Sequence, residues 1–194
     1  MTVHVIPIWV KSPYDCLEIS TVSNSGKYRE LSPFVLGPID TYLPNVRSEN
    51  FENLWQYSKI YKEHFSIDED LILPVWYKWR EAGWANPRAV RYPMGKGIKP
   101  EFSYWDGNRL GYIEARKMIY APIYAKYVIK TDSYARLKAL YSTRVEITLK
   151  DYDAYDHLVM GMSLIDVINN PKRKMGHAFV LAMLLQGVLE ECLR

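Results

Sequence analysis

Phe51-Glu52-Asn53-Leu54-Trp55-Gln56-Tyr57-Ser58-Lys59 decides the fold class, because this stretch predicts a helix with both an apolar and a polar side. Glu52, Gln56 and Lys59 follow one another at i, i+4 and i+7, so they share one stripe of that helix. The side chains beside the stripe are large and apolar. Polar groups in such surroundings are costly to bury unless they bind something, which makes the stripe a candidate site. The alternative is a solvated helix face with a charge pair of little consequence.

Composition describes a globular chain of ordinary size. The 194 residues are 48% hydrophobic and 14% aromatic, which favours a packed core over disorder. The net charge of +3 permits an anionic ligand without predicting nucleic-acid binding. Cys16 and Cys192 are the only cysteines, so reduced thiols and a cytoplasmic location are expected, without a zinc site. We find no signal-peptide pattern and no apolar run long enough to span a membrane.

Local patterns predict a mainly α (α+β) fold, as a single domain over residues 1–194 with a small N-terminal β-hairpin. The hairpin pairs two strands rich in β-branched residues, and the helices are bounded by caps, prolines and glycines. The expected elements are strands at 2–10 and 17–22, a helix from Ser48 or Asn50 to about His64, a helix that follows a capping box at Ser66-Ile67-Asp68-Glu69 and ends near 83–86, a helix at 110–130 with a break at Pro122, a short helix from Asp132 or Ser133 to Tyr141, a strand at 145–149 and a last helix at 175–192.

A long loop at residues 86–105 is the second candidate. It interleaves basic side chains, including Arg91 and Lys96, with glycines that let backbone amides approach a phosphate. The alternative is an exposed basic loop. Trp105 and Asp106 follow it, and this pair suits a flat ligand because the ring stacks and the acid accepts hydrogen bonds. The alternative there is a core tryptophan beside a turn.

Asp151, Asp153 and Asp156 come directly after the predicted strand at 145–149. Three acids so close together can bind a metal or supply an acid–base group, or they can form a polar turn. The spacing does not continue as a calcium-binding EF-hand. Near the C-terminus a basic loop leads into an apolar helix, and Gly176 at the helix start suggests close approach of another backbone or a ligand.

Taken in order, these motifs resemble the NADAR (YbiA-like) superfamily over residues 32–185. That family has an aromatic segment, a helix with a Glu-x-x-x-Gln-x-x-Lys core, a tryptophan, a lysine-containing helix that ends in threonine, an acidic residue and a closing glycine helix. The matching residues here are Ser32-Pro33-Phe34, Gly37-Pro38-Ile39, Glu52, Gln56, Lys59, Trp105, Lys117, Thr131, Asp151 or Asp153, and Lys174-Met175-Gly176.

The resemblance implies hydrolysis of an N-glycosidic bond in a ribosylated base or nucleotide, such as removal of ADP-ribose from modified nucleic acid. Glu52 would stabilise the oxocarbenium-like transition state and orient water, and Asp153 would be the second acid, with Asp151 and Asp156 as alternatives. Substrate binding is assigned to Gln56, Lys59, Arg91, Lys96, Trp105, Asp106, Lys117 and Gly176.

This reading needs no metal and no cofactor, and its partner is a nucleotide or an ADP-ribosylated base, possibly within nucleic acid. No membrane partner is expected. Two other readings stay open. One is a catalytically inactive protein that binds nucleotides or modified DNA, and the other is a phage-encoded interaction protein that docks on a host protein.

Overall fold

The chain divides into two compact units in the computed structural model, which describes residues 1–194. Unit 1 comprises residues 1–33 and 116–194, and unit 2 is the continuous stretch 34–115. Helices hold 39% of the residues and strands 17%, so the fold is mixed α/β with small sheets. No helix combines the length and the apolar character that crossing a bilayer requires.

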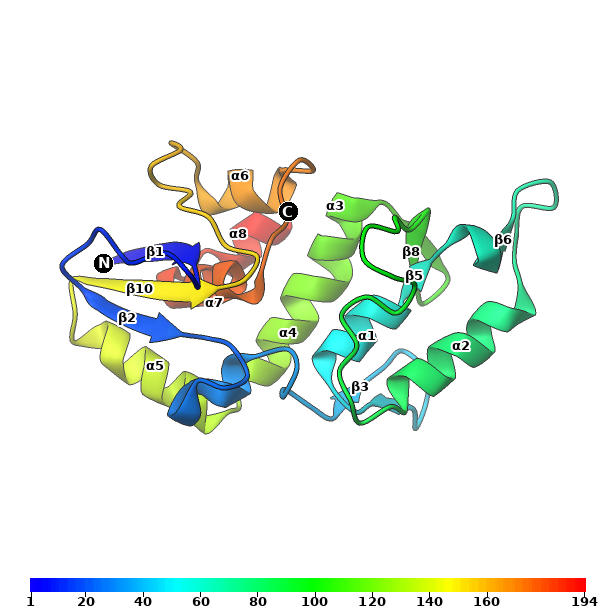
Figure 1. Cartoon of the computed structure of the whole chain (residues 1–194), viewed down its shortest axis with the longest axis horizontal. Coiled ribbons are helices and arrows are strands. Elements are labelled where there is room, and N and C mark those ends of the chain that lie inside the picture. The colour runs from blue at the N-terminus through cyan, green and yellow to red at the C-terminus, as the bar shows by residue number, and fades with distance from the viewer. The chain divides into compact units, whose positions relative to one another are not determined.

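A three-stranded parallel sheet forms the centre of unit 1 (Figure 1). Its order is β1 (Thr2–Pro7), β10 (Glu146–Asp151) and β2 (Leu17–Ser20), and both outer strands run parallel to β10. The predicted N-terminal hairpin is therefore wrong. Both predicted strands exist, but each pairs with a segment more than a hundred residues away instead of with the other.

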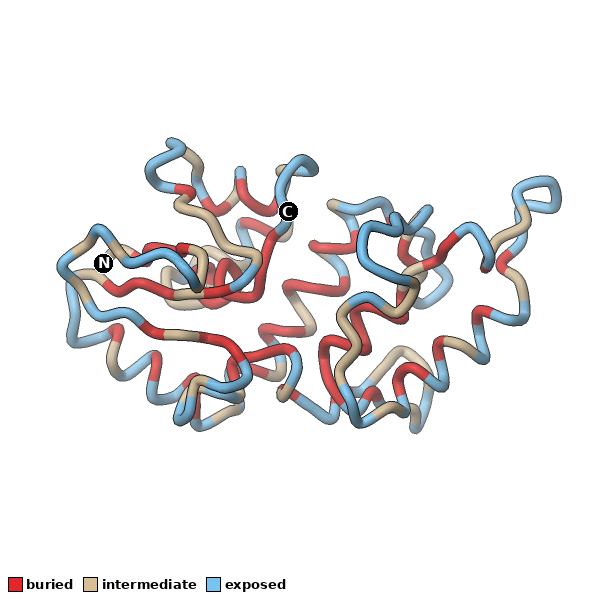
Figure 2. The backbone as a smooth tube through the Cα atoms, in the orientation of Figure 1, coloured by how far each residue is buried: buried red, intermediate tan, exposed pale blue.

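Strands β1 and β10 are buried at most of their positions (Figure 2). Val3 and Val5 of β1 and Ile147 and Leu149 of β10 are completely buried. Helix α7 (His177–Gln186), which is apolar almost throughout, packs against β1 and β10. A parallel sheet covered in this way reads as a run of apolar residues, which is why the strands are visible in the sequence.

The remaining helices of unit 1 largely follow the predicted boundaries. Residues 112–128 are helical throughout, as expected for 110–130, but the helix does not break at Pro122, since α4 continues through it directly after a π-helical turn. The last predicted helix is divided at Gly187, whose φ of 71° ends α7. The helices are η1 (Gly26–Leu31), η3 (Arg116–Tyr120), α4 (Ala121–Val128), α5 (Asp132–Ser142), α6 (Leu164–Asn169), α7 and α8 (Leu189–Leu193).

Unit 2 combines short helices with two- and three-stranded sheets. Its helices are α1 (Phe51–Tyr57), η2 (Lys62–His64), α2 (Pro74–Trp84) and α3 (Tyr112–Ala115). Its antiparallel sheets are β3 (Ile39–Asp40) with β4 (Arg47–Ser48), β6 (Phe65–Ser66) with β7 (Leu71–Ile72), and β5 (Lys59–Ile60) with β8 (Phe102–Trp105) and β9 (Asn108–Leu110).

Three predictions are tested in unit 2. Asn50 caps α1 as expected, because its side chain accepts a hydrogen bond from the Asn53 amide at 2.9 Å. The helix is shorter than predicted, since the chain enters β5 at Lys59 instead of continuing to His64. The capping box at 66–69 is wrong: those residues belong to the β6–β7 hairpin, and the next helix starts at Pro74.

Helices α1 and α2 pack so closely that one contact excludes any side chain. A Cβ at Gly83 of α2 would lie 2.0 Å from the ring of Tyr57 on α1. Trp76 and Trp84, also on α2, are fully buried. The core of unit 2 is therefore largely aromatic, and α2 holds α1 in place.

Candidate functional site

The predicted stripe forms a continuous chain of hydrogen bonds. The Gln56 amide nitrogen donates to Glu52 Oε1 at 2.8 Å, and Lys59 Nζ donates to Gln56 Oε1 at 2.7 Å. Glu52 and Gln56 are only 6% and 8% exposed, so the alternative of a solvated helix face is wrong. Lys59 Nζ also lies 4.7 Å from the centroid of the Trp55 ring, a cation–π contact.

The chemistry of this relay follows from its order. A carboxylate at one end is linked through an amide to an ammonium group at the other, so the amide is fixed in one orientation. Glu52 lies in the first turn of α1, where the helix dipole favours negative charge. The relay therefore holds a buried carboxylate on α1 and an ammonium group at the start of β5 in defined positions, so Lys59 is not on the helix as predicted.

Helix α1 also fastens the start of the predicted basic loop. Asn53 Nδ2 donates to the carbonyls of Asn86 and Arg88 at 2.8 and 3.0 Å, and the Val90 amide donates to Asn53 Oδ1 at 2.8 Å. The loop predicted over 86–105 ends earlier, because residues 86–101 have no helix or strand but residues 102–105 form β8. Within this loop Arg91 is half-buried and Lys96 is exposed. The loop follows α2, and Asn53 of α1 holds its first residues.

Trp105 and Asp106 have different surroundings. Trp105 is half-buried on β8, with its ring edge-on to Tyr42 at 4.9 Å and near Trp84 at 6.1 Å. Asp106 and Gly107 form the exposed turn between β8 and β9, both with positive φ. Asp-Gly is a strong signal for a two-residue hairpin turn, so the backbone by itself explains the residue type of Asp106.

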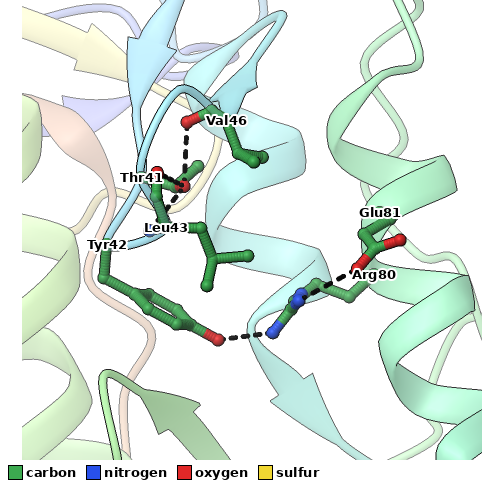
Figure 3. A network of polar contacts seen from close by, with 6 residues as sticks. All are labelled: Thr41, Tyr42, Leu43, Val46, Arg80 and Glu81. Atoms are coloured by element: carbon green, nitrogen blue, oxygen red, sulfur yellow. Dashed lines mark hydrogen bonds and ion pairs between the residues drawn. The ribbon is translucent and has the colours of Figure 1, made fainter.

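A buried arginine beside Tyr42 escaped the sequence analysis (Figure 3). Arg80 of α2 is 3% exposed, and its guanidinium lies 4.8 Å from the ring centroids of both Trp76 and Trp84. Its Nη1 donates to Tyr42 Oη at 2.5 Å. Burial raises the pKa of Tyr42 to about 12, although the positive charge of Arg80 opposes that rise. The sequence signal that could have identified Arg80 is its i, i+4, i+8 spacing with the tryptophans at 76 and 84.

The pocket next to this cluster has a volume of about 500 Å³ and is lined by residues 40–47. None of the predicted site residues lines it. Tyr42 lines this pocket, accepts a hydrogen bond from Arg80 and contacts the ring of Trp105. Trp105 is therefore a predicted site residue that contacts a pocket-lining residue without lining the pocket itself.

In unit 1 the three acids have separate surroundings, with Asp151 as the last residue of β10 and Asp153 and Asp156 after the strand. Asp151 is buried: His177 Nδ1 lies 3.1 Å from its Oδ2, and the amide of Tyr152 donates to its Oδ1 at 2.6 Å. Burial by itself raises the pKa of the Asp151 carboxyl, but the charge of His177 and the accepted hydrogen bonds outweigh it and hold that pKa below its ordinary value. Asp156 accepts a hydrogen bond from Tyr14 Oη at 2.5 Å.

Asp153, the acid chosen from the sequence, is the one beside Gly176. The Gly176 amide donates to the Asp153 carbonyl at 3.0 Å, and Lys174 Nζ lies 3.8 Å from the Asp153 carboxylate. A Cβ at Gly176 would lie 2.1 Å from Asp151 Oδ2. The prediction that Gly176 permits a close approach is thus confirmed, and the approaching group belongs to the chain itself.

Arg116 fixes the loop that leads to Gly176. This buried side chain donates from Nη1 to the carbonyl of Asn170 at 2.8 Å and from Nη2 to the carbonyl of Arg173. Lys117, the next residue in the chain and one of the predicted substrate-binding residues, is half-buried on η3. Burial raises the pKa of the Cys192 thiol, and the charge of Lys117 opposes that shift, which places Lys117 near α8. The Arg116 and His177 contacts were not predicted, since their partners are distant in sequence.

The predicted residues fall in both units. Unit 1 contains Asp153, Gly176 and Lys117, and unit 2 contains the other seven, Glu52, Gln56, Lys59, Arg91, Lys96, Trp105 and Asp106. Direct contacts join the relay in unit 2 and the Asp153–Gly176 pair in unit 1. No group of three or more His, Cys, Asp or Glu side chains is arranged to hold a metal ion. Comparisons with models of protein families, with curated proteins and with solved structures find no significant match.

Proposed function

We propose that the protein is an N-glycosidase of the NADAR superfamily that hydrolyses the bond between ribose and base in a ribosylated base or nucleotide. Removal of ADP-ribose from modified nucleic acid is the example that the resemblance suggests. The observation that carries the proposal is the buried relay of Glu52, Gln56 and Lys59. These are the residues on which the resemblance depends.

The relay suits this chemistry because cleavage of an N-riboside develops positive charge at C1′. A carboxylate held in a buried, hydrogen-bonded position stabilises such charge without reorganising. We assign that role to Glu52, which also orients the attacking water. Gln56 fixes the carboxylate, and Lys59 supplies a cation for a substrate phosphate.

The other roles follow the same logic. Asp153, the acid that the resemblance assigns to this role, is the candidate for assisting departure of the base. Trp105 stacks on the base. We assign the contacts to base and phosphate in unit 2 to Arg91, Lys96 and Asp106, while Lys117 and Gly176 of unit 1 stay predictions from the resemblance.

The test compares Glu52→Gln with the unmodified protein on ADP-ribosylated DNA and on nucleotide N-ribosides. The amide has the shape of the carboxylate but no charge, so we expect the rate of ribose release to fall at least ~100-fold while the fold is kept. Glu69→Gln removes an exposed carboxylate from the β6–β7 turn and serves as the matched control. Circular dichroism of both variants checks folding.

Unchanged activity in Glu52→Gln would show that this carboxylate is not catalytic. If neither substrate is cleaved, titration calorimetry with ADP-ribose separates the remaining readings. Binding without turnover would assign the protein as a nucleotide binder, and no heat at millimolar ligand would favour an interaction protein.

A further inference from the structure

Two large aromatic side chains are exposed at the edge of the parallel sheet where its strands end. Trp9 follows the end of β1 by two residues and is 70% exposed, and Tyr152 directly follows β10 and is 51% exposed. Their ring centroids are 6.5 Å apart, with 46° between the planes. The Ile8 amide donates to the Asp151 carbonyl at 2.9 Å, which fastens the two segments together.

This edge is where the carboxyl ends of all three parallel strands meet. In open α/β sheets ligands bind outside the carboxyl ends of the strands. The proposed catalytic machinery does not use either ring. A pair of exposed aromatic rings in this position therefore suits a ligand with a flat apolar face that can stack on them.

Positive charge lies beside the ring pair. The exposed run Lys172-Arg173-Lys174 is joined to the segment after Tyr152, because Lys174 Nζ lies 3.8 Å from the Asp153 carboxylate and the Gly176 amide bonds to the Asp153 carbonyl. The Arg173 guanidinium lies 5.0 Å from the Tyr155 ring centroid. The exposed basic run is thus linked through Lys174 and Gly176 to the segment that follows Tyr152.

We propose that Trp9 and Tyr152 are a stacking platform for unpaired bases of single-stranded nucleic acid, with Lys172 and Arg173 along its phosphates. Proteins that bind single strands without reading sequence combine these two features: aromatic rings on which bases stack and a positively charged path for the backbone. The proposal rests on the proposed function and extends it, because it identifies single-stranded nucleic acid as the polymer that would carry the ribosylated base.

The test measures fluorescence anisotropy of a fluorescein-labelled, unmodified 20-nucleotide DNA strand with the full chain. Trp9→Ala and Tyr152→Ala should each raise Kd on the order of 10-fold, and Trp9→Phe should keep most of the affinity. Lys172→Ala should flatten the dependence of log Kd on log salt by about 0.7. Val145→Ala, at the opposite edge of the sheet and 79% exposed, and Lys138→Ala on α5 are the matched controls and should change neither quantity.

Several outcomes would overturn the platform. These are no binding of the strand by the unmodified chain, an affinity unchanged in both aromatic variants, or an equal loss in Val145→Ala. Trp9-dependent flotation with phosphatidylserine vesicles, without DNA binding, would assign the rings to a membrane surface instead. The strand has no ribosylated base, so Glu52→Gln should bind it normally, and failure of the platform is thereby separated from failure of the glycosidase.

Discussion

At Gly176 the backbone passes so close to Asp151 that hydrogen is the only side chain that fits. A methyl group there would lie 2.1 Å from the Asp151 carboxylate, which is itself held by His177 and the start of α7. We expect Gly176→Ala to lower the free energy of unfolding by about 2 kcal/mol or more. Urea denaturation measures it. Gly111→Ala is the control, because its methyl would meet only the end of the Glu114 side chain at 3.3 Å, and equal losses in both variants would contradict this explanation.

The Asp151–His177 pair makes a second prediction, which concerns charge. Both side chains are 6% exposed, so Asp151→Asn removes a buried carboxylate from beside His177 Nδ1 and should cost about 3 kcal/mol at pH 7. The pKa of the native carboxyl is below its ordinary value of 3.8. Its contribution to stability is therefore complete above that ordinary value and is lost as pH falls through the lowered one.

Acidification below about pH 4 should accordingly destabilise the unmodified protein more than Asp151→Asn. Urea denaturation at pH 7 and pH 3 makes the comparison, with Asp15→Asn, an exposed residue of the β1–β2 loop, as the control. An Asp151→Asn protein as stable as the control at pH 7 would show that the ion pair contributes nothing.

The sequence indicated one side of this contact and not the other. Gly176 was predictable as a site of close approach because a glycine at a helix start has a conformational cost that something must offset. Which group lies beside Gly176 was not predicted: the structure places the Asp151 carboxylate and the Asp153 carbonyl there. Strand β10 runs two residues further than predicted and carries Asp151 into the core, and only the pairing of β10 with β1 shows this.

Among the elements, α1 has a second task besides carrying the relay. Its Asn53 side chain makes three hydrogen bonds to the backbone of residues 86–90. We expect Asn53→Ala to leave two carbonyls and one amide without these partners and to cost about 2 kcal/mol. Amide hydrogen exchange at Val90 should become faster, whereas Asn108→Ala, which removes only contacts within its own hairpin, should leave Val90 unchanged. Unaltered exchange in Asn53→Ala would show that the loop is held by other groups.

Element types were more predictable than element ends. Asn50 gave the start of α1 because a cap is a local interaction, and Pro74 marked the first turn of α2 for the same reason. The end of α1 was missed because β5 exists only through its pairing with β8, more than forty residues away. The same argument explains the wrong N-terminal hairpin. Alternation shows that a strand exists but does not name its partner.

On the scale of the whole molecule, unit 1 is built from both ends of the chain, since β10 lies between β1 and β2. Unit 2 is continuous in sequence. Nothing in local composition marks the change at residues 33 and 115, and the predicted site residues fall on both sides of it. The relay could be predicted because all its members lie within eight residues, whereas the buried contacts of Arg116, His177 and Arg80 depend on the tertiary fold.

Both units should respond to pH in the same sense, which gives the last prediction. Burial lowers the pKa of His64 in unit 2 and of His157 in unit 1. Their contributions to stability are complete above the ordinary value of 6.5 and are lost as pH falls below it. Tyr14, hydrogen-bonded to a carboxylate, and the buried Tyr42 and Tyr61 have pKa values raised to about 12, so their contributions are complete below the ordinary value of 10 and are lost as pH rises toward 12.

The free energy of unfolding should therefore be level between about pH 6.5 and 9, the ordinary value for the buried Cys192 thiol, and fall on both sides. Urea denaturation followed by tryptophan fluorescence across pH 5–11 measures this profile. Replacing His64 and His157 by Phe should flatten the acidic side between pH 6.5 and 5 and leave the alkaline side as it was, since the tyrosines are untouched. Stability that stays constant from pH 7 to pH 5 in the unmodified protein would mean that the two histidines bind protons equally well in the folded and unfolded chains.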